Sequence, residues 1–173
     1  MERRQQYHET LYNCFDAQTW PNKQLVVIDS GFKPSPFFSA LNDPRVVYIL
    51  REGEDTTDTV GWKRNAAIER ADGEVIAHFD DDDIYCPIYL ERMVGILRKS
   101  GRQVCKLKAW YTVDVETGRV GHFDGNKELP GVGEELRQEM IYSYGFSILH
   151  TKDVWRKTKY PEVPCLPCTQ NQY

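Results

Sequence analysis

The sequence predicts an α/β fold, in which a mostly parallel sheet is flanked by helices. Three continuous apolar runs alternate with segments of helical periodicity, and these runs cover residues 24–28, 45–50 and 74–79. Continuous runs of this length are typical of strands that are buried on both faces, as in parallel sheets. With 173 residues, the chain fits a single domain that spans residues 1–173.

Helices are expected before and between these strands. Apolar side chains spaced by about 3.6 residues predict a helix over residues 7–15, which ends before Pro21 because proline cannot continue a helix. A short helix over residues 36–41 follows the first strand, and a longer one over 59–71 follows the second. A fourth helix covers residues 87–99.

The alternation of helices and strands changes after Gly101. The residues after it predict a long strand, a turn and a returning strand, which together form a β-hairpin. A loop that is rich in glycine and charged residues, with a short helix, is expected to follow. One more strand and one more helix are expected after this loop. The ranges are 104–115, 116–118 and 119–123 for the hairpin, 124–139 for the loop, 142–149 for the strand and 151–158 for the helix.

The composition, with 40% hydrophobic and 28% charged residues, is that of an ordinary soluble protein. Its formal net charge of -4 argues against a nucleic-acid binder, which normally carries a basic patch. No stretch approaches the roughly 20 apolar residues that cross a bilayer, and the N-terminus lacks the apolar run of a secretory signal. A cytoplasmic location is therefore the default expectation, although an anchor outside these residues stays open.

The cysteines are five in number, and three of them are scattered along the chain. We expect Cys14, Cys86 and Cys105 to behave as small buried hydrophobes. Cys165 and Cys168 form a C-x-x-C pair, which supplies only two of the four ligands of a structural zinc site. Neighbouring prolines argue against the helix N-terminus that a thioredoxin-like pair requires, so we assign no function to it.

Four consecutive carboxylates, Asp80 to Asp83, are the strongest functional signal in the sequence. Adjacent like charges repel one another, so the run is unfavourable unless something offsets it. It follows a predicted strand directly, and in open α/β sheets ligands bind outside the carboxyl ends of the strands. Carboxylates there can hold Mg²⁺ or Mn²⁺, with phosphate oxygens and water completing the shell. Alternation along an extended end points Asp80 and Asp82 the same way, with Asp81 opposed.

Other interpretations of the acidic run explain less of it. One or two of the carboxylates can stabilise the following helix N-terminus, by about 0.3 to 1 kcal/mol each, but hardly all four. A calcium EF-hand loop is excluded because Tyr85 occupies the position that requires glycine. A phosphotransferase with an Asp pair as nucleophile and acid expects that pair on the first strand, whereas here it follows the third. A purely structural α/β domain leaves the run unexplained.

Further polar residues are expected at the same edge of the sheet. Asp29 ends the first strand, and Lys63 and Arg64 lie near the start of a helix, where cations can neutralise a diphosphate. Taken singly, Asp29 also fits a turn-forming residue, and the two cations fit a solvated helix face. Their convergence on one edge favours a binding site. We expect His78 to be packed and hydrogen-bonded within its strand.

Several groups of residues carry a family resemblance. They are QTWPNKQLVVIDSG at 18–31, GWKRNA at 61–66, ADGE at 71–74, FDDDDIYCP at 79–87, YGFS at 144–147 and KDVW at 152–155. In this order, they resemble family 2 glycosyltransferases of the GT-A fold, over about residues 5–158. The resemblance implies a GT-A-type, Rossmann-like domain with a nucleotide-binding half, residues 1–100, and an incomplete acceptor-side half, residues 101–173.

The resemblance also implies a nucleotide-sugar donor and the residues that bind it. Asp29 would contact the nucleobase, and Arg64, with Lys63, would lie near the nucleotide. Asp80 would be close to the ribose, and Asp81 is a further nucleotide-binding candidate.

The implied metal ligands are Asp82 and Asp80, which form the family's D-x-D pair, with Asp83 in a supporting role. The ion would be Mn²⁺ or Mg²⁺, which offsets charge on the departing diphosphate. Family members transfer a sugar from a nucleotide-diphosphate donor, usually a UDP-sugar, to an acceptor hydroxyl with inversion. A carboxylate base deprotonates that hydroxyl. Whether the acceptor is a glycan, a lipid or a protein stays open.

Two departures from the family pattern support a second hypothesis. The family's opening strand, with its Thr-x-Asn or Thr-x-Arg turn, does not precede the first helix, and no Glu-Asp pair follows Trp155. Glu162 is then the remaining candidate base. We therefore expect a chain truncated at both ends, with an inactive nucleotide- or metal-binding homologue as the alternative. An unpaired interior sheet edge also favours self-association, so a homo-oligomer is a further expectation.

Overall fold

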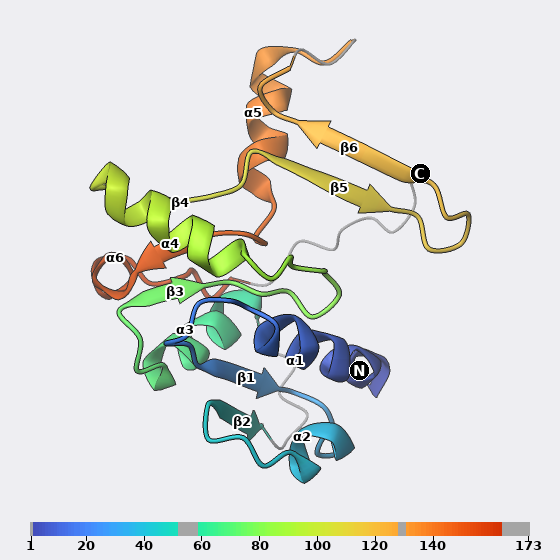
Figure 1. Cartoon of the computed structure of the whole chain (residues 1–173), viewed down its shortest axis with the longest axis vertical. Helices are drawn as coiled ribbons and strands as arrows, with labels where there is room; N and C mark the ends of the chain where they lie inside the picture. The colour runs from blue at the N-terminus through green and yellow to red at the C-terminus, as the bar shows by residue number, and fades with distance from the viewer. Residues whose placement is uncertain (1, 52–58, 128–130, 164–173) are drawn as a thin grey trace.

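The computed structural model describes residues 2–51, 59–127 and 131–163, whose helices and strands confirm the predicted α/β class (Figure 1). The first elements are η1 (Glu2–Tyr7, a 3-10 helix), α1 (His8–Asp16), β1 (Leu25–Asp29), α2 (Pro36–Ala40), β2 (Val46–Leu50), α3 (Val60–Arg70), β3 (Val75–Ala77) and α4 (Tyr89–Ser100). The later ones are β4 (Val104–Cys105), β5 (Ala109–Val113), β6 (Val120–Asp124), α5 (Glu134–Ser143), β7 (Leu149–Thr151) and α6 (Lys152–Lys157).

The strands form three small sheets. β1 pairs with β2 in parallel, in a register that runs from Leu25 opposite Val46 to Asp29 opposite Leu50. The second sheet has the order β3-β7-β4, and β7 is antiparallel to both neighbours. The third is the antiparallel hairpin β5–β6. Among the described strands, parallel pairing is thus limited to β1 and β2, whereas the sequence predicted a mostly parallel sheet. A hydrophobic pattern shows that a strand is buried, but it does not show which strand it joins or in which direction.

Amphipathic helices build the core around these sheets. α1 places Leu11 and Phe15, four residues apart, against Leu25 of β1 and Phe38 of α2. α4 buries its residues at helical spacing against β7, where Leu149 is fully buried. A third cluster joins Ile68 of α3 and Ile76 of β3 to Trp155 of α6. Helices therefore pack on the sheets β1–β2 and β3–β7–β4, as the predicted α/β arrangement requires.

Local capping residues fix several helix ends. The Ser35 hydroxyl accepts a hydrogen bond from the Phe38 amide at 3.3 Å and starts α2, and the Thr59 hydroxyl accepts from the Trp62 amide at 3.0 Å and starts α3. α4 ends at Gly101, whose φ of 65° lies in the left-handed region that glycine adopts without strain.

Three sequence expectations need correction. The strand expected over 142–149 begins only at Leu149, because α5 continues to Ser143 and Ser147 has a φ of 61°, which no strand residue adopts. The short helix expected within 124–139 is α5, which begins inside that range and continues beyond it to Ser143. Cys86 is exposed rather than buried, whereas Cys14 is buried and Cys105 half-buried. The C-x-x-C pair lies outside the described residues.

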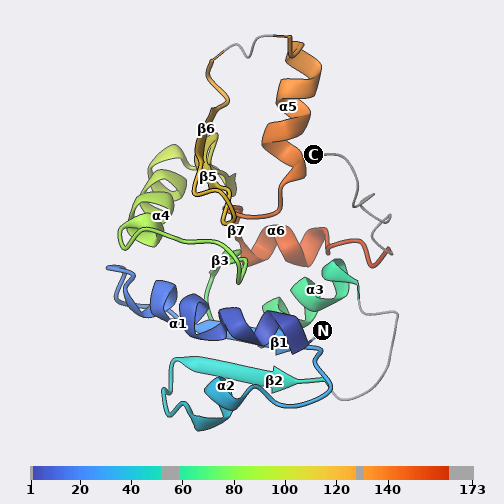
Figure 2. The same ribbon diagram turned by 90° about the vertical axis from the view of Figure 1, so that its right-hand side faces the viewer.

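The hairpin β5–β6 and the helix α5 project away from the remaining elements (Figures 1 and 2). We call residues 109–143 the arm, and the other described residues the body. None of the helices in the described ranges has the length and apolar character needed to cross a membrane. The expected division into halves at residue 100 stays a prediction.

Candidate functional site

The carboxyl ends of β1 and β3 lie beside each other, and η1 contacts both of them. Gln5 Nε2 donates to Asp29 Oδ2 at 3.4 Å, at the end of β1. Arg4 Nε donates to Asp81 Oδ2 at 3.0 Å, beyond the end of β3. The predicted convergence of polar residues on one sheet edge is therefore present. All five predicted nucleotide-binding residues line one cavity of about 1010 Å³, and these are Asp29, Lys63, Arg64, Asp80 and Asp81.

Asp29 is held in place by three donors. The Tyr48 hydroxyl donates to Asp29 Oδ2 at 2.8 Å, and the Gly31 amide donates to Oδ1 at 2.8 Å. The Gly31 contact, two residues on, is the side-chain turn that we considered from the sequence. Gln5 completes the set at the longer distance given above. Asp29 is thus a rigid carboxylate at the edge of the cavity, and its predicted contact with a nucleobase stays a prediction.

Lys63 ties α3 to the end of β1. Its Nζ donates to the Ser30 hydroxyl at 2.6 Å, and burial lowers the pKa of this amine. The nearby Asp29 carboxylate acts in the opposite direction and favours the charged amine. The cation therefore points along the cavity wall and does not lie on a solvated helix face.

Arg64 lies between the acidic run and the C-terminal part of the body. Its Nη2 is 3.9 Å from Asp80 Oδ1, and its guanidinium is 5.5 Å from the centre of the Tyr160 ring. A side chain at position 145 would overlap this guanidinium, so Gly145 leaves the space that it occupies. Arg64 thus faces the cavity with a bidentate donor group fixed from two sides.

The acidic run has a cationic partner that the sequence did not reveal. Arg4 bonds to Asp81 and also donates to Asp82 Oδ2 at 3.1 Å. Burial raises the pKa of Asp80, which Arg64 partly opposes, and burial followed by the charge of Asp80 raises the pKa of Asp83. Positive charge near these carboxylates is therefore favourable.

The arrangement of the carboxylates suits a metal ion that has both protein and nucleotide ligands. It suits less well an ion that is held by protein ligands alone. Within residues 2–51, 59–127 and 131–163, no group of three or more His, Cys, Asp or Glu side chains is arranged to hold a metal ion. Mg²⁺ commonly takes only one or two protein carboxylates together with phosphate oxygens and water. The Asp82 side chain is 48% exposed and that of Asp80 40%, so both can reach such an ion. Asp82 and Asp83 do not line the cavity.

Glu162, the candidate base, lies next to α3. Asn65 Nδ2 donates to Glu162 Oε1 at 3.0 Å and to the Tyr160 carbonyl at 2.9 Å. Asn65 Oδ1 accepts from Trp155 Nε1 at 2.9 Å, and the backbone of Pro161 contacts Gly61. These contacts bring the segment after α6 back to the helix that carries Arg64. The role of Glu162 as base stays a prediction.

His78 is packed as expected, with 9% of its surface exposed and Nε2 at 2.7 Å from the Tyr160 hydroxyl. Burial, with the nearby charge of Arg64, lowers the pKa of His78 to about 3.

Sequence reasoning missed two residues near the site, Tyr160 and Lys106. Lys106 Nζ donates to the carbonyl of Tyr144 at 2.7 Å and to that of Phe146 at 2.9 Å. Neither residue carries a motif that marks it, because Tyr160 meets Arg64, and Lys106 comes near the charges of Asp80 and Arg64, only when distant segments fold together.

Comparison with known proteins identifies the family of this chain. Residues 4–156 match the protein family described as Glycosyl transferase family 2. Over 74 residues the chain is 35% identical to a protein of Escherichia coli (strain K12) that is named "Putative colanic acid biosynthesis glycosyl transferase WcaA". The aligned part is 40% of this chain and 25% of that protein, so the match spans about a quarter of the relative's length.

Proposed function

Because the chain belongs to glycosyl transferase family 2, we propose that it binds a UDP-sugar and transfers the sugar to an acceptor hydroxyl with inversion, on a GT-A-type domain. The acceptor is a glycan, a lipid or a protein. The observation that carries the proposal is the single cavity lined by Asp29, Lys63 and Arg64 together with the start of the acidic run.

The charges around this cavity suit a nucleotide diphosphate. Lys63 and Arg64 come from successive positions of α3 and supply positive charge to the two phosphates, with Arg64 as a bidentate donor. Asp29, fixed by Tyr48 and Gly31, offers a carboxylate acceptor to the N–H groups of a nucleobase. Asp80 and Asp81 line the same cavity, and the proposal puts Asp80 near the ribose, with Asp81 as a further nucleotide-binding residue.

A divalent cation, Mn²⁺ or Mg²⁺, belongs to the proposal, with Asp82 as ligand, Asp80 beside it and Asp83 in support. When bound, it supplies positive charge to the departing diphosphate. The exposed carboxylate of Asp82 supports this assignment, and the ion would replace the contact that Arg4 makes with Asp82 Oδ2. The chain's own contribution is to hold these carboxylates at the end of β3.

The first test is a calorimetric titration of UDP into the chain, with and without Mn²⁺, repeated on Asp82→Ala. We expect Mn²⁺-dependent binding that weakens at least about tenfold in this variant, which corresponds to about 1.4 kcal/mol. Asp153→Ala is the matched control, because Asp153 is a 66% exposed carboxylate whose partner is Arg156 in α6. Absent binding in a folded sample, or equal losses in both variants, would contradict the proposed donor site.

A second candidate function is binding of the nucleotide sugar without turnover. It is favoured by the hydrogen bond of Glu162 to Asn65, since a base that is already engaged is less available for an acceptor proton. Release of UDP from UDP-sugar in the presence of acceptors separates the two. Turnover that Glu162→Gln abolishes, with UDP binding intact, supports the transferase and its base. Tight UDP binding with no turnover supports the binding protein.

A further inference from the structure

The segment that follows α6, residues 159–162, lies along one face of α3, and we call it the strap. It contacts α3 at three positions that are each four residues apart, and such positions share one face of a helix. The contacts are Pro161 with Gly61, Tyr160 and Glu162 with Asn65, and Lys159 with Glu69. The strap therefore runs antiparallel to the helix that carries Arg64.

Asn65 holds the strap with its entire hydrogen-bonding capacity. The side-chain amide of asparagine has two donor hydrogens and an oxygen that accepts two bonds. Nδ2 donates to the Tyr160 carbonyl at 2.9 Å and to Glu162 Oε1 at 3.0 Å. Oδ1 accepts from Trp155 Nε1 at 2.9 Å and from the Tyr160 amide at 3.0 Å. Because Asn65 is only 4% exposed, water competes little for these bonds, and they fix the backbone of Tyr160 by both its amide and its carbonyl.

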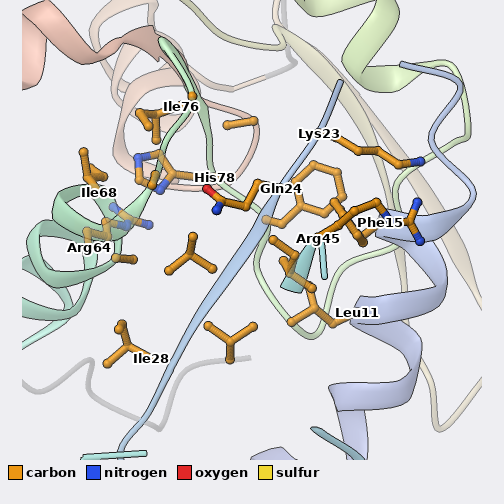
Figure 3. A pocket seen from close by; sticks show the side chains of 18 of the residues that line it. Leu11, Phe15, Lys23, Gln24, Ile28, Arg45, Arg64, Ile68, Ile76 and His78 are labelled. Atoms are coloured by element: carbon orange, nitrogen blue, oxygen red, sulfur yellow. The ribbon is translucent and has the colours of Figure 1, made fainter. Parts of the chain in front are cut away.

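The Tyr160 side chain reaches from the strap to both parts of the site. The centre of its ring is 5.5 Å from the Arg64 guanidinium, which is within the range of a cation–π interaction. Its hydroxyl is 2.7 Å from Nε2 of His78, two residues before Asp80. Arg64 of α3 and His78 after β3 both line the cavity (Figure 3). One side chain therefore joins the proposed phosphate-binding cation to the strand that leads into the acidic run.

The segment around Gly145 forms a second wall for the Arg64 guanidinium. Any side chain at position 145 would overlap the guanidinium. Lys106 Nζ donates to the carbonyls of the two residues that flank Gly145, at 2.7 and 2.9 Å, and so holds this wall in place. A guanidinium binds phosphate oxygens through two parallel bonds, which depend on its orientation. The direction of Arg64 is therefore set by the Gly145 wall and by the ring of Tyr160 together.

We propose that Tyr160 is a positioning residue for the transfer reaction. Its ring sets Arg64 in the direction that two oxygens of the nucleotide diphosphate require, and its backbone, through Asn65, sets the strap that carries Glu162. Binding of the nucleotide sugar and placement of the candidate base are then coupled, because both depend on the strap. This inference rests on the proposed function, since it needs a diphosphate at Arg64.

The test is a double-mutant cycle on UDP binding with Mn²⁺, using Tyr160→Leu, Arg64→Ala and the combined variant. Loss of the ring should weaken UDP binding by about three- to tenfold when Arg64 is present, which is the range of a partly desolvated cation–π contact. In the Arg64→Ala background the same change should weaken binding by less than about twofold, because no guanidinium is left to orient. A contribution of Tyr160 to the fold alone would give equal losses in both backgrounds.

Two control variants accompany the cycle. Tyr160→Phe keeps the ring and removes the hydroxyl, so it should retain UDP affinity within about twofold. Tyr142→Leu removes a tyrosine that is 70% exposed on α5, and it should bind UDP like the parent chain. Equal losses in the two backgrounds, or a Tyr160→Phe variant as weak as Tyr160→Leu, would overturn this inference alone. Absent UDP binding by the folded parent chain would overturn the proposed function together with it.

Amide exchange of the parent chain gives a readout that needs no variant. The Tyr160 amide donates to Asn65 Oδ1, so its exchange reports detachment of the strap. Coupling between sites is reciprocal, and saturating UDP with Mn²⁺ should therefore slow this exchange by at least about threefold. The Arg137 amide, bonded to the Gly133 carbonyl in the arm at 3.0 Å, is the control and should change little. If Tyr160→Leu does not fold, or the combined variant binds UDP too weakly to measure, this exchange decides, and an unchanged rate at Tyr160 overturns the inference.

Discussion

The body and the arm place their large apolar side chains differently. In the body, three clusters of apolar residues pack between helices and sheets, and Leu149 in one of them is fully buried. In the described part of the arm, Ile141 is the one large apolar residue that is buried. Side chains that are 49% exposed or more are found on both arm strands and on α5, and they are Tyr111, Val113, Val120, Leu136 and Tyr142.

The arm is held mainly at its base. There Trp110 stacks on Phe123, with ring centres 4.3 Å apart, and meets Phe146 edge-on at 5.1 Å and Tyr144 at 5.7 Å. Lys106 binds the carbonyls of the latter two residues. Apolar residues thus stabilise the body as a core and the arm only where it joins the body. The stability of the arm's own fold therefore does not explain why its apolar side chains are exposed.

The largest expected effect contrasts a buried residue of the body with an exposed residue of the arm. Leu149→Ala removes a fully buried side chain and should lower the free energy of unfolding by about 2 to 5 kcal/mol. Val113→Ala, at a side chain that is 61% exposed, should change it by less than about 0.5 kcal/mol. Urea denaturation of both variants measures the difference. Similar losses would show that the arm has a core after all.

A second, smaller effect concerns acid stability of the body. His8 is buried beside the Ser35 hydroxyl at 2.8 Å, and burial lowers its pKa. Below about pH 6.5 the unfolded chain binds a proton at His8 that the folded chain does not, so stability is full above that pH and is lost below it. The loss is at most about 1.4 kcal/mol per pH unit for this group.

His8→Gln removes this proton uptake and keeps a polar side chain next to Ser35. Urea denaturation at pH 7 and pH 5 should therefore show a smaller decrease for the variant than for the parent chain. An unchanged decrease would mean that other groups account for the acid sensitivity of the body.

The smallest effect is a local one in the arm. Trp110→Leu removes the stacked contact with Phe123, and an aromatic pair contributes about 0.5 to 1.5 kcal/mol beyond its buried area. We expect faster amide exchange in β5 and β6 and little change in β1 or β7, because the arm can open without the body. Equal acceleration in all four strands would show that arm and body unfold together, and the comparison would fail.

The strands of the first half and the acidic run were predictable because their signals are local. Continuous apolar runs gave β1 and β2 within one or two residues, and the placement of Asp80 directly after a strand gave its position at a sheet edge. The convergence of Asp29 with Lys63 followed from the rule that strand ends share an edge.

Contacts between distant segments were not predictable. The pairing of β3 with β7, the ion pair of Arg4 with Asp81 and the contact of Tyr160 with His78 each join residues that are more than 70 positions apart. No periodicity encodes such a partner. The late start of β7 was missed for a related reason, since the left-handed Ser147, two residues before it, has no sequence signature.

The pairing of β3 with β7 has a consequence for the order in which the chain can mature during synthesis. Leu149, the partner of Ala77, follows it by 72 residues, so β3 leaves the ribosome long before β7 is made. At about 5 to 20 residues per second, this delay is roughly 4 to 14 s. For that time a newly made β3 lacks β7, its one partner among the described strands, and its open edges are exposed to other nascent chains. Translation speed over the arm therefore sets how long this protein is vulnerable to misassembly.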